Sequence, residues 1–333
     1  MTVKLAINGF GRIGRCALRA LVEHARDDVE IVAINDLGPP ETNAHLLKYD
    51  SLHGRFAADV KVEDGALVVD GRRIRVTAER DPAKLPWSDV DVALECTGVF
   101  TDAAKAAAHL ENGSTRVLIS APAKGADRTV VYGVNHASLE AGDRIVSNAS
   151  CTTNCLAPVV KVLDDAFGVE TGYMTTVHSY TGDQPTLDGL HKDLYRARAA
   201  AMSMIPTSTG AARAVGLVLP HLEGRLDGSA IRVPTPDVSL VDLCVMTRAA
   251  ATPETVAEAM RAAAAKGPLA GILGVEDAPL VSQDFLHDPR SSIFAPEGTR
   301  LTEGGMLRVM SWYDNEWAFS CRMLDTAGAM ARL

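Results

Sequence analysis

The feature that most constrains the fold is a glycine-rich turn near the start of the chain. A β-prone run, residues 3–7, leads into Gly9-Phe10-Gly11-Arg12-Ile13-Gly14, and a stretch with one apolar face follows. Glycines in this G-x-G-x-x-G spacing let backbone amides approach an anion at a helix N-terminus, whose dipole favours negative charge. The motif is weak alone, but a strand before it and a helix after it make it specific. The sequence therefore predicts a strand–turn–helix unit that binds a pyrophosphate.

An acidic residue follows the next predicted strand. Asp36 comes directly after residues 30–35, at the distance of about twenty residues that dinucleotide-binding units show. A carboxylate here accepts hydrogen bonds from a ribose diol and repels a 2′-phosphate, so we expect NAD in preference to NADP. A glycine turn without a ligand is the alternative. The motif alone does not decide whether Arg12 and Arg80 bind the cofactor or lie on the surface.

The length of 333 residues favours two domains, because it is long for one hydrophobic core. In the first part, predicted strands alternate with helices, which is typical of a parallel sheet with right-handed crossovers. Asp-Gly pairs separate short alternating runs and predict an antiparallel insertion. The predicted strands are 3–7, 30–35, 91–95 and 116–120, the insertion is 60–62, 66–69 and 73–76, and a helix at 102–110 is capped by Thr101.

The second part contains long strands with few helices between them, which predicts an antiparallel or mixed sheet. The predicted fold is therefore α/β followed by α+β. A Rossmann-type dinucleotide-binding domain occupies 1–150, a catalytic domain occupies 151–314, and a helix at 315–333 packs back on the first domain. The predicted strands of the second part are 171–178, 226–233, 238–248, 271–275 and 306–313, with helices at 151–167 and 251–266.

Composition narrows the class of protein. The chain is 47% hydrophobic and 23% charged, with a formal net charge of -9, which disfavours nonspecific binding to nucleic acid or to anionic membranes. The first strand-like run begins at Val3 with no apolar signal core before it, and no apolar stretch reaches spanning length. We therefore expect a cytoplasmic protein whose primary partner is neither a nucleic acid nor a membrane.

The cysteines indicate chemistry and not cross-linking. None of the six, at positions 16, 96, 151, 155, 244 and 321, forms a C-x-x-C pair, so we expect no metal site. A chain of this size needs no disulfide framework, so a reduced state is expected. A cysteine in a polar motif is then a candidate nucleophile.

Cys151 is that candidate. Serine, threonine and asparagine cluster at 147–154, directly before the apolar run 156–167, and this pattern predicts a helix start. Cys151 would lie in the first helical turn, where the dipole lowers a thiol pKa and favours the thiolate. Cys155 lies one turn further along and is expected to be a small buried side chain.

A nucleophilic thiol needs a base, and His178 has the best position for it. His178 follows the strand-like run 173–177 and leads into a polar loop. From a strand end it can reach a helix N-terminus, accept the thiol proton and then assist the departure of a hydride. The other eight of the nine histidines have no comparable setting, so we expect them to be structural or exposed.

Four blocks of the sequence resemble the phosphorylating glyceraldehyde-3-phosphate dehydrogenases of bacterial type. They are residues 6–15, 147–158, 232–236 and 311–317, and they extend from one end of the chain to the other. The cysteine block and the Trp-Tyr-Asp-Asn-Glu-Trp block are highly specific. The resemblance implies that Cys151 forms a hemithioacetal, His178 acts as base, a hydride passes to NAD, and inorganic phosphate releases the thioester as 1,3-bisphosphoglycerate. It also implies a homotetramer in which the loop 181–205 reaches toward a neighbour's cofactor.

The resemblance also implies binding residues. A reaction with two phosphate groups needs two anion sites, and hydroxyls with one guanidinium each are suitable donors. Without the resemblance, Arg196 and Arg232 would be interpreted as members of surface ion pairs. A predicted helix at 211–219 would place Thr209 and Gly210 at its N-terminus. The implied residues are Gly9, Gly11, Arg12, Ile13, Gly14, Asp36, Arg80, Ser120 and Asn315 for the cofactor, with Asn315 on the nicotinamide amide; Thr181 and Arg232 for the substrate phosphate; and Ser150, Thr152, Arg196, Thr209 and Gly210 for the attacking phosphate.

Some positions depart from the family pattern. Ser179 stands where the family often has alanine, a feature shared with the related erythrose-4-phosphate dehydrogenases, whose thioester is hydrolysed by water. Leu190 stands where many NAD-specific members have a proline that blocks a 2′-phosphate, so dual use of NAD and NADP stays open. Ala318 and Phe319 replace a common glycine–tyrosine pair, and we expect consequences for packing only.

Three alternative functions stay open from the sequence. The nearest is the erythrose-4-phosphate dehydrogenase. The second is a cofactor-binding regulatory or RNA-associated protein without turnover, which the net charge and the intact thiol–histidine pair disfavour. The third is a cysteine hydrolase that uses Cys151 and His178 alone, which the dinucleotide motif disfavours.

Overall fold

The glycine-rich turn joins the first strand to the first helix, as the sequence predicts. In the computed structural model, which describes residues 2–333, β1 (Val3–Asn8) ends just before Gly9 and α1 (Arg12–Glu23) begins at Arg12. Gly9 has φ +91°, and a Cβ there would lie 2.7 Å from the backbone nitrogen of Thr97. A Cβ on Gly14 would lie 2.4 Å from the carbonyl oxygen of Gly9. Sterics therefore require glycine at both positions, because backbone cannot move aside cheaply.

This geometry makes Gly14 and Gly11 a matched pair. Gly14→Ala is expected to lower the free energy of unfolding by about 1–3 kcal/mol, the usual cost of forcing a methyl group into packed space. A Cβ on Gly11 would have no atom within 4 Å, so Gly11→Ala should leave stability unchanged. Urea denaturation of the two variants measures the difference. Equal stability for both would contradict the steric role of Gly14.

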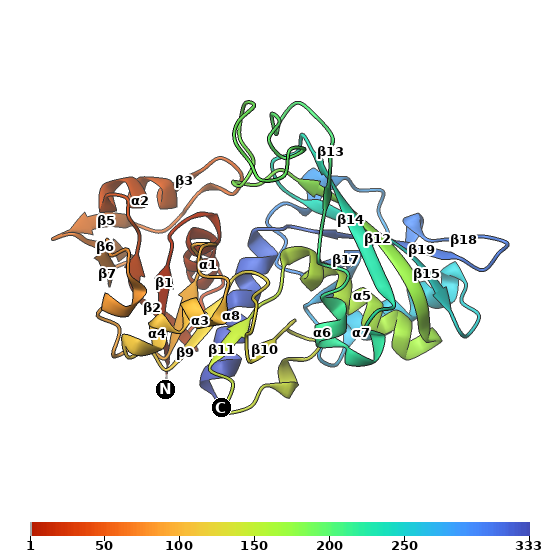
Figure 1. The fold of residues 1–333 in the computed structure, drawn as a ribbon, viewed down its shortest axis with the longest axis horizontal. Coiled ribbons are helices and arrows are strands. Elements are labelled where there is room, and N and C mark those ends of the chain that lie inside the picture. Colours follow the sequence, from red (N-terminus) through yellow and green to blue (C-terminus); the bar gives the residue numbers. More distant parts are fainter. Residues whose placement is uncertain (1) are drawn as a thin grey trace. The chain divides into compact units, whose positions relative to one another are not determined.

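The chain divides into two units. The N-terminal unit comprises residues 2–132, 136–150 and 319–333, and the C-terminal unit comprises 133–135 and 151–318. The elements of the N-terminal unit are labelled in Figure 1. Besides β1 and α1 they are β2 (Val29–Asn35), α2 (Pro40–Lys48), β3 (Tyr49–Asp50), β4 (Gly54–Arg55), β5 (Val60–Glu63), β6 (Ala66–Val69), β7 (Arg72–Thr77), β8 (Val92–Glu95), α3 (Ala103–Ala106), α4 (Ala108–Glu111), β9 (Arg116–Ile119), β10 (Arg128–Thr129), β11 (Ile145–Ser147) and most of α8 (Trp317–Ala331).

One nine-stranded sheet forms the centre of the N-terminal unit, in the order β10-β11-β9-β8-β1-β2-β7-β6-β5. The pairs from β10 to β7 are parallel, and β7-β6 and β6-β5 are antiparallel. The predicted insertion is therefore continuous with the main sheet through β7. The chain leaves β1 toward β2 on one side and returns to β8 on the other. In an open parallel sheet, such a reversal of strand order is where a ligand binds, beyond the carboxyl ends of the strands.

The predicted helix 102–110 is two short helices. α3 ends at Ala106 and α4 begins at Ala108. The cap is Asp102 and not Thr101, because the Asp102 carboxylate accepts a hydrogen bond from the Ala104 amide at 3.0 Å. The last helix, predicted from residue 315, begins at Trp317.

Contacts within the N-terminal unit hold α8 against its first and last segments. Arg26 donates to Asp325 at 2.7 Å, and Thr326 donates to the Asn148 side chain at 2.8 Å. Ser320 donates to the carbonyl of Ile13 at 3.4 Å. The C-terminal residues therefore pack with the Rossmann-type sheet, although they follow the second domain in sequence.

The C-terminal unit is built on a mixed sheet. Its path is β13-β14-β12-β15-β19-β17-β16, and β18 pairs with β19. β12 is parallel to β14 and antiparallel to β15, which confirms the predicted fold class. Its elements are α5 (Cys151–Phe167), β12 (Val169–Ser179), β13 (Ile205–Ser208), α6 (Val215–Val218), β14 (Leu226–Val233), β15 (Ser239–Thr247), α7 (Pro253–Ala265), β16 (Leu273–Val275), β17 (Ser292–Phe294), β18 (Arg300–Leu301) and β19 (Leu307–Tyr313).

Two expectations for this unit are wrong. The predicted helix 211–219 is reduced to the four residues of α6, and turns occupy 211–214. Thr209 and Gly210 therefore do not stand at a helix N-terminus. The Thr209 hydroxyl accepts a hydrogen bond from the Ala211 amide at 3.2 Å. This local hydrogen bond favours a turn over the helix that the sequence pattern of 211–219 predicts. The strands β13, β17 and β18 were not predicted, because each is too short to show a pattern.

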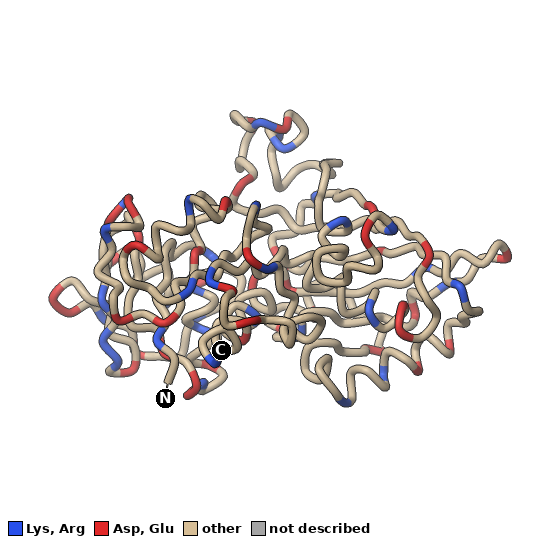
Figure 2. The backbone as a smooth tube through the Cα atoms, turned by 60° about the horizontal axis from the view of Figure 1, so that its bottom comes forward, with Lys and Arg blue, Asp and Glu red and all other residues tan. Residues whose placement is uncertain are grey.

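Charged residues of both signs are interspersed along the backbone (Figure 2), and the formal net charge is -9. Across residues 2–333, none of the helices combines the length and the apolar character that crossing a membrane requires.

Candidate active site

A pocket lies at the carboxyl ends of the parallel strands of the N-terminal unit. Its volume is about 430 Å³, and it is open to one side. Of the predicted cofactor residues, Gly9, Gly11, Asp36 and Arg80 line it. The other lining residues are Asn8, Asn35, Leu37, Glu79, Cys96, Thr97, Val99 and Phe100.

The glycine turn and Asp36 suit a dinucleotide. The Asp36 carboxylate accepts the amides of Phe10 and Gly38, each at 2.9 Å, one on each oxygen. These bonds fix the carboxylate and leave each oxygen a further lone pair for a ribose hydroxyl. The open space beside Gly11 lets a pyrophosphate approach the backbone at the start of α1. The residues present therefore fit NAD.

Other predicted cofactor residues do not line this pocket. The Arg12 guanidinium forms a two-pronged ion pair with Asp50. Ile13 and Gly14 lie inside the first turn of α1. Ser120 follows β9, where its side chain hydrogen-bonds Cys96, one of the lining residues.

In the C-terminal unit, Cys151 and His178 lie together. Cys151 is the first residue of α5, as predicted, and His178 lies near the end of β12. The Cys151 Sγ is 3.6 Å from the His178 Nε2. The His178 Nδ1 is 2.7 Å from the carbonyl oxygen of Ser179. Because a carbonyl only accepts, Nδ1 carries the proton in neutral His178, and the Nε2 lone pair faces the thiol.

The protonation state of this pair differs from the sequence expectation. Burial raises the pKa of the half-buried Cys151 thiol, which outweighs the nearby positive charge of Arg232. The pKa of His178 is lowered to about 3, mainly by burial and in part by the positive charge of Arg232. The expected thiolate is therefore not favoured before substrate binds. The pair is a neutral thiol beside a neutral imidazole, which suits removal of the proton during attack.

Arg232 reaches this pair because of strand register. It lies opposite His178 on the parallel neighbour strand β14. Its Nη1 donates to the Ser179 carbonyl at 2.9 Å and to the Thr181 hydroxyl at 3.0 Å. Its Nε is buried and has no hydrogen-bond partner among the described residues. A buried N–H of this kind suits an anion, since a guanidinium binds phosphate oxygens well.

A second arginine lies on the loop before β13. Arg196 donates to the Asp183 carboxylate at 2.9 Å, to the Thr207 hydroxyl at 2.9 Å and to the Ser208 carbonyl at 3.3 Å. Its positive charge also lowers the pKa of His178. Thr209 and Gly210 follow Ser208 directly in the chain. The contact of Arg196 with the Ser208 carbonyl therefore places these three predicted phosphate residues near one another.

The remaining predicted residues, Ser150, Thr152 and Asn315, differ in what their side chains contact. Ser150 directly precedes α5. The Thr152 hydroxyl hydrogen-bonds the Tyr313 hydroxyl at 2.8 Å, so it faces the interior. The Asn315 Oδ1 accepts the hydroxyls of Ser179 at 2.9 Å and Ser239 at 2.7 Å, which orients its Nδ2 group.

Sequence reasoning missed Tyr313 and Asp183. The Tyr313 ring stands edge-on to His178, with centroids 5.9 Å apart, and its hydroxyl also bonds Thr176 at 3.0 Å. Asp183 accepts a hydrogen bond from Thr181 as well as the ion pair from Arg196. Tyr313 belongs to the Trp-Tyr-Asp-Asn-Glu-Trp block, and that was the signal available for it.

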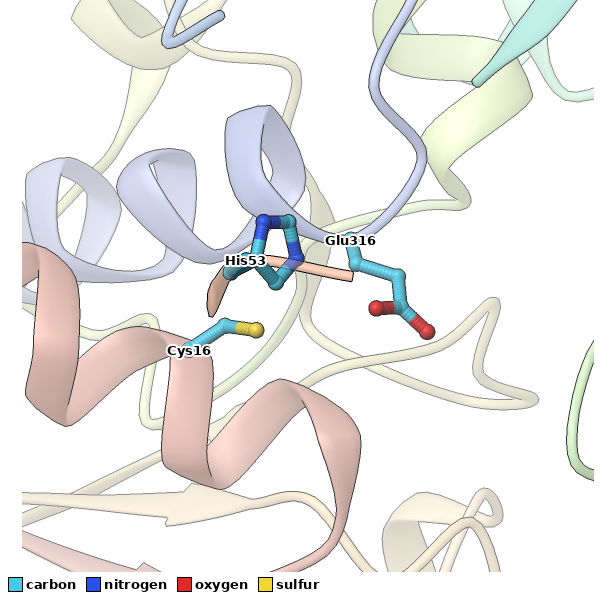
Figure 3. A group of neighbouring side chains, drawn as sticks. All are labelled: Cys16, His53 and Glu316. Atoms are coloured by element: carbon cyan, nitrogen blue, oxygen red, sulfur yellow. The ribbon is translucent and has the colours of Figure 1, made fainter. Parts of the chain in front are cut away.

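A different thiol and imidazole lie close together in the N-terminal unit. Cys16 is on α1 and His53 is in the turn between β3 and β4 (Figure 3), with their ligand atoms within 4.8 Å. Cys16 is 1% exposed and sits in mid-helix, away from the positive end of the dipole. We therefore expect Cys16 to be a structural thiol, although a histidine lies close to it.

A dinucleotide pocket in one unit and a thiol–imidazole pair with two arginines in the other define an oxidoreductase that acts on an anionic substrate. Comparisons with known proteins identify the family. Residues 3–103 match the family described as glyceraldehyde 3-phosphate dehydrogenase, NAD binding domain, and residues 150–315 match its C-terminal domain. The chain belongs to the glyceraldehyde-3-phosphate dehydrogenase family, and its cofactor is NAD.

Curated relatives match over the full length. A glyceraldehyde-3-phosphate dehydrogenase of Cereibacter sphaeroides is 66% identical over 333 residues, with 100% of both chains covered. One of Xanthobacter flavus is 64% identical over 335 residues, again with 100% of both chains covered. One of Zymomonas mobilis is 58% identical, over 100% of this chain and 99% of the relative.

Proposed function

We propose that the chain catalyses the NAD-dependent oxidative phosphorylation of D-glyceraldehyde 3-phosphate to 1,3-bisphosphoglycerate, a reaction of glycolysis and gluconeogenesis. The observation that carries the proposal is the Cys151–His178 pair beside Arg232, whose buried Nε has no hydrogen-bond partner within residues 2–333. Full-length similarity to curated glyceraldehyde-3-phosphate dehydrogenases supports the choice of substrate.

In the proposed mechanism, the Cys151 sulfur attacks the aldehyde carbon while His178 Nε2 accepts the thiol proton. His178 then returns that proton to the aldehyde oxygen, and the product is a hemithioacetal with a free hydroxyl group. His178 then accepts the hydroxyl proton of the hemithioacetal as the C–H bond breaks. The chemistry that NAD supplies is acceptance of the hydride ion from that carbon. The thioester that remains is attacked by a phosphate oxygen, the C–S bond breaks, and His178 returns a proton to the sulfur.

The binding roles follow the family pattern. We assign the substrate's phosphate to Arg232 and Thr181, which already contact each other at 3.0 Å. We assign the attacking phosphate to Arg196, Thr209 and Gly210, with Ser150 and Thr152 at the start of α5. Asp36 binds the adenosine ribose, and Asn315 binds the nicotinamide amide through the Nδ2 group that its two serine partners orient.

Omission of inorganic phosphate is the test of this proposal. Without phosphate, the enzyme is expected to release about one equivalent of NADH per site as the thioester accumulates, and turnover should resume when phosphate is added. A steady rate that is the same without phosphate would support the erythrose-4-phosphate dehydrogenase alternative, in which water releases the thioester. Initial rates with NAD and with NADP in the same assay show whether Leu190 permits both cofactors.

The proposed assembly is a homotetramer. The loop between β12 and β13 extends from the C-terminal sheet (Figure 1) and exposes large apolar side chains. Leu187, Leu190 and Leu194 are 72%, 106% and 81% exposed. Such a patch suits burial against another copy of the chain, and light scattering of the purified protein reports the mass of the assembly.

A further inference from the structure

A chain of buried polar side chains leads from the lining of the dinucleotide pocket into the interior of the N-terminal unit. Its members stand at the carboxyl ends of neighbouring parallel strands: Asn35 on β2, Asn8 on β1 and Glu95 on β8. His109, on α4, completes the chain. These four side chains are 4%, 2%, 1% and 0% exposed.

Glu95 is the centre of this network. Its Oε2 accepts hydrogen bonds from the Asn8 Nδ2 at 2.7 Å and from the His109 Nε2 at 2.9 Å. Its Oε1 accepts the Thr97 amide at 2.8 Å and the Thr97 hydroxyl. A carboxylate offers about four acceptor positions, and here four donors fill them. Because a carboxylate oxygen accepts, His109 Nε2 is the donor in this pair.

The network contacts the pocket through two of its members and through Thr97, which is bonded to Glu95. Asn8, Asn35 and Thr97 line the pocket, whereas Glu95 and His109 do not. Asn35 donates to the Asn8 Oδ1 at 2.7 Å, so Glu95 fixes both asparagines in sequence. The Thr97 backbone also packs against Gly9 of the glycine turn. Glu95 therefore holds Asn8 and Thr97 directly, whereas Asn35 is also held by Thr77 and Glu79.

His109 in turn fixes Glu95. Its ring stacks on Trp87, with centroids 5.5 Å apart and planes 8° from parallel. That stacking restricts the ring, so its Nε2–H points at one side of the carboxylate. Without this donor, a buried carboxylate would lack one partner and would rotate or admit water.

We propose that His109 is a positioning residue for the dinucleotide pocket. It never touches the cofactor, and it acts through Glu95 on Asn8 and Thr97. This inference rests on the assignment of the pocket to the adenosine half of NAD made under "Proposed function". The sequence pattern had placed His109 among the structural histidines.

The experiment measures binding of NAD and of ADP-ribose to the full chain by calorimetry. His109→Phe keeps a planar ring against Trp87 but loses the donor, and it is expected to raise both Kd values by about tenfold, the size of one charge-assisted hydrogen bond. His109→Gln keeps a donor and should stay within about threefold of the wild type. Because ADP-ribose lacks nicotinamide, equal losses for the two ligands place the effect at this pocket.

Two readouts separate positioning from stability. His109→Phe should speed amide hydrogen exchange at Thr97 in the cofactor-free protein, since that amide is bonded to Glu95. His221→Phe removes a surface histidine that pairs with Asp164 at 2.6 Å in the other unit, and its Kd values should not change. If His109→Phe does not fold, His109→Asn replaces it, because its shorter side chain cannot reach Glu95.

The outcomes are distinct. A folded His109→Phe with wild-type Kd for ADP-ribose overturns the positioning role, provided that Asp36→Ala weakens ADP-ribose binding. If Asp36→Ala also leaves that Kd unchanged, the assignment of the pocket is wrong and the role of His109 is overturned with it. Weaker binding in His109→Phe with recovery in His109→Gln supports the role.

Discussion

Cys151→Ala is expected to lower kcat/KM for phosphate-dependent NAD reduction by more than about 10⁴-fold, because removal of a covalent nucleophile leaves only binding and charge stabilisation. NAD binding should stay within about twofold, since Cys151 is not among the residues that line the dinucleotide pocket. The measurements are steady-state rates and calorimetry on the same preparation.

Cys244→Ala is the matched control. Cys244 is a partly exposed thiol on β15 of the same unit, opposite Tyr173 in the strand register and outside the cluster around His178. Its removal should leave kcat within about twofold. If a clean Cys151→Ala protein kept its turnover, the covalent mechanism would be wrong, whatever the result for Cys244.

His178→Asn is expected to lower kcat/KM by about 10²- to 10⁴-fold, the usual contribution of a positioned general base. Asparagine keeps a polar side chain of similar length, so the Ser179 carbonyl can retain a donor. The thiol would then have to ionise without help.

The pH profile identifies the base directly. With its pKa lowered to about 3, His178 stays neutral and able to accept a proton above that pH, so the wild-type rate should vary little between about pH 6 and 8. In His178→Asn, the reactive species is the small thiolate fraction of Cys151, whose pKa burial raises. That fraction increases about tenfold per pH unit below the pKa, so the variant's rate should rise steeply with pH.

A flat profile in the variant, with a rate near that of the wild type, would exclude His178 as the base. His221→Asn serves as the control, because its exposed imidazole pairs with Asp164 in the same unit and lies outside the cluster around Cys151. Added imidazole should partly restore the rate of His178→Asn and leave that of His221→Asn unchanged.

The predicted elements that agree with the structure are those with strong local signals. The glycine turn and the alternating strands of the first part required only short-range patterns, and α5 begins at Cys151 because polar caps precede an apolar run. The helix predicted at 211–219 was wrong, because local hydrogen bonding by Thr209 competes with helix propensity. Likewise, β17 takes only three residues and depends on its long-range partner β19.

The sequence by itself determined that a dinucleotide motif, a helix-terminal thiol and a strand-end histidine occur in one chain, because each is a local pattern. Only the tertiary structure decided how those groups behave. Parallel pairing of β12 with β14 places Arg232 opposite His178. Arg232 also hydrogen-bonds Ser179, although these two residues are 53 positions apart in the sequence. Burial then reverses the thiolate expectation for Cys151, because desolvation acts through the whole surrounding fold. The same long-range packing brings His109 to Glu95 in the interior of the N-terminal unit, where no sequence pattern marks it.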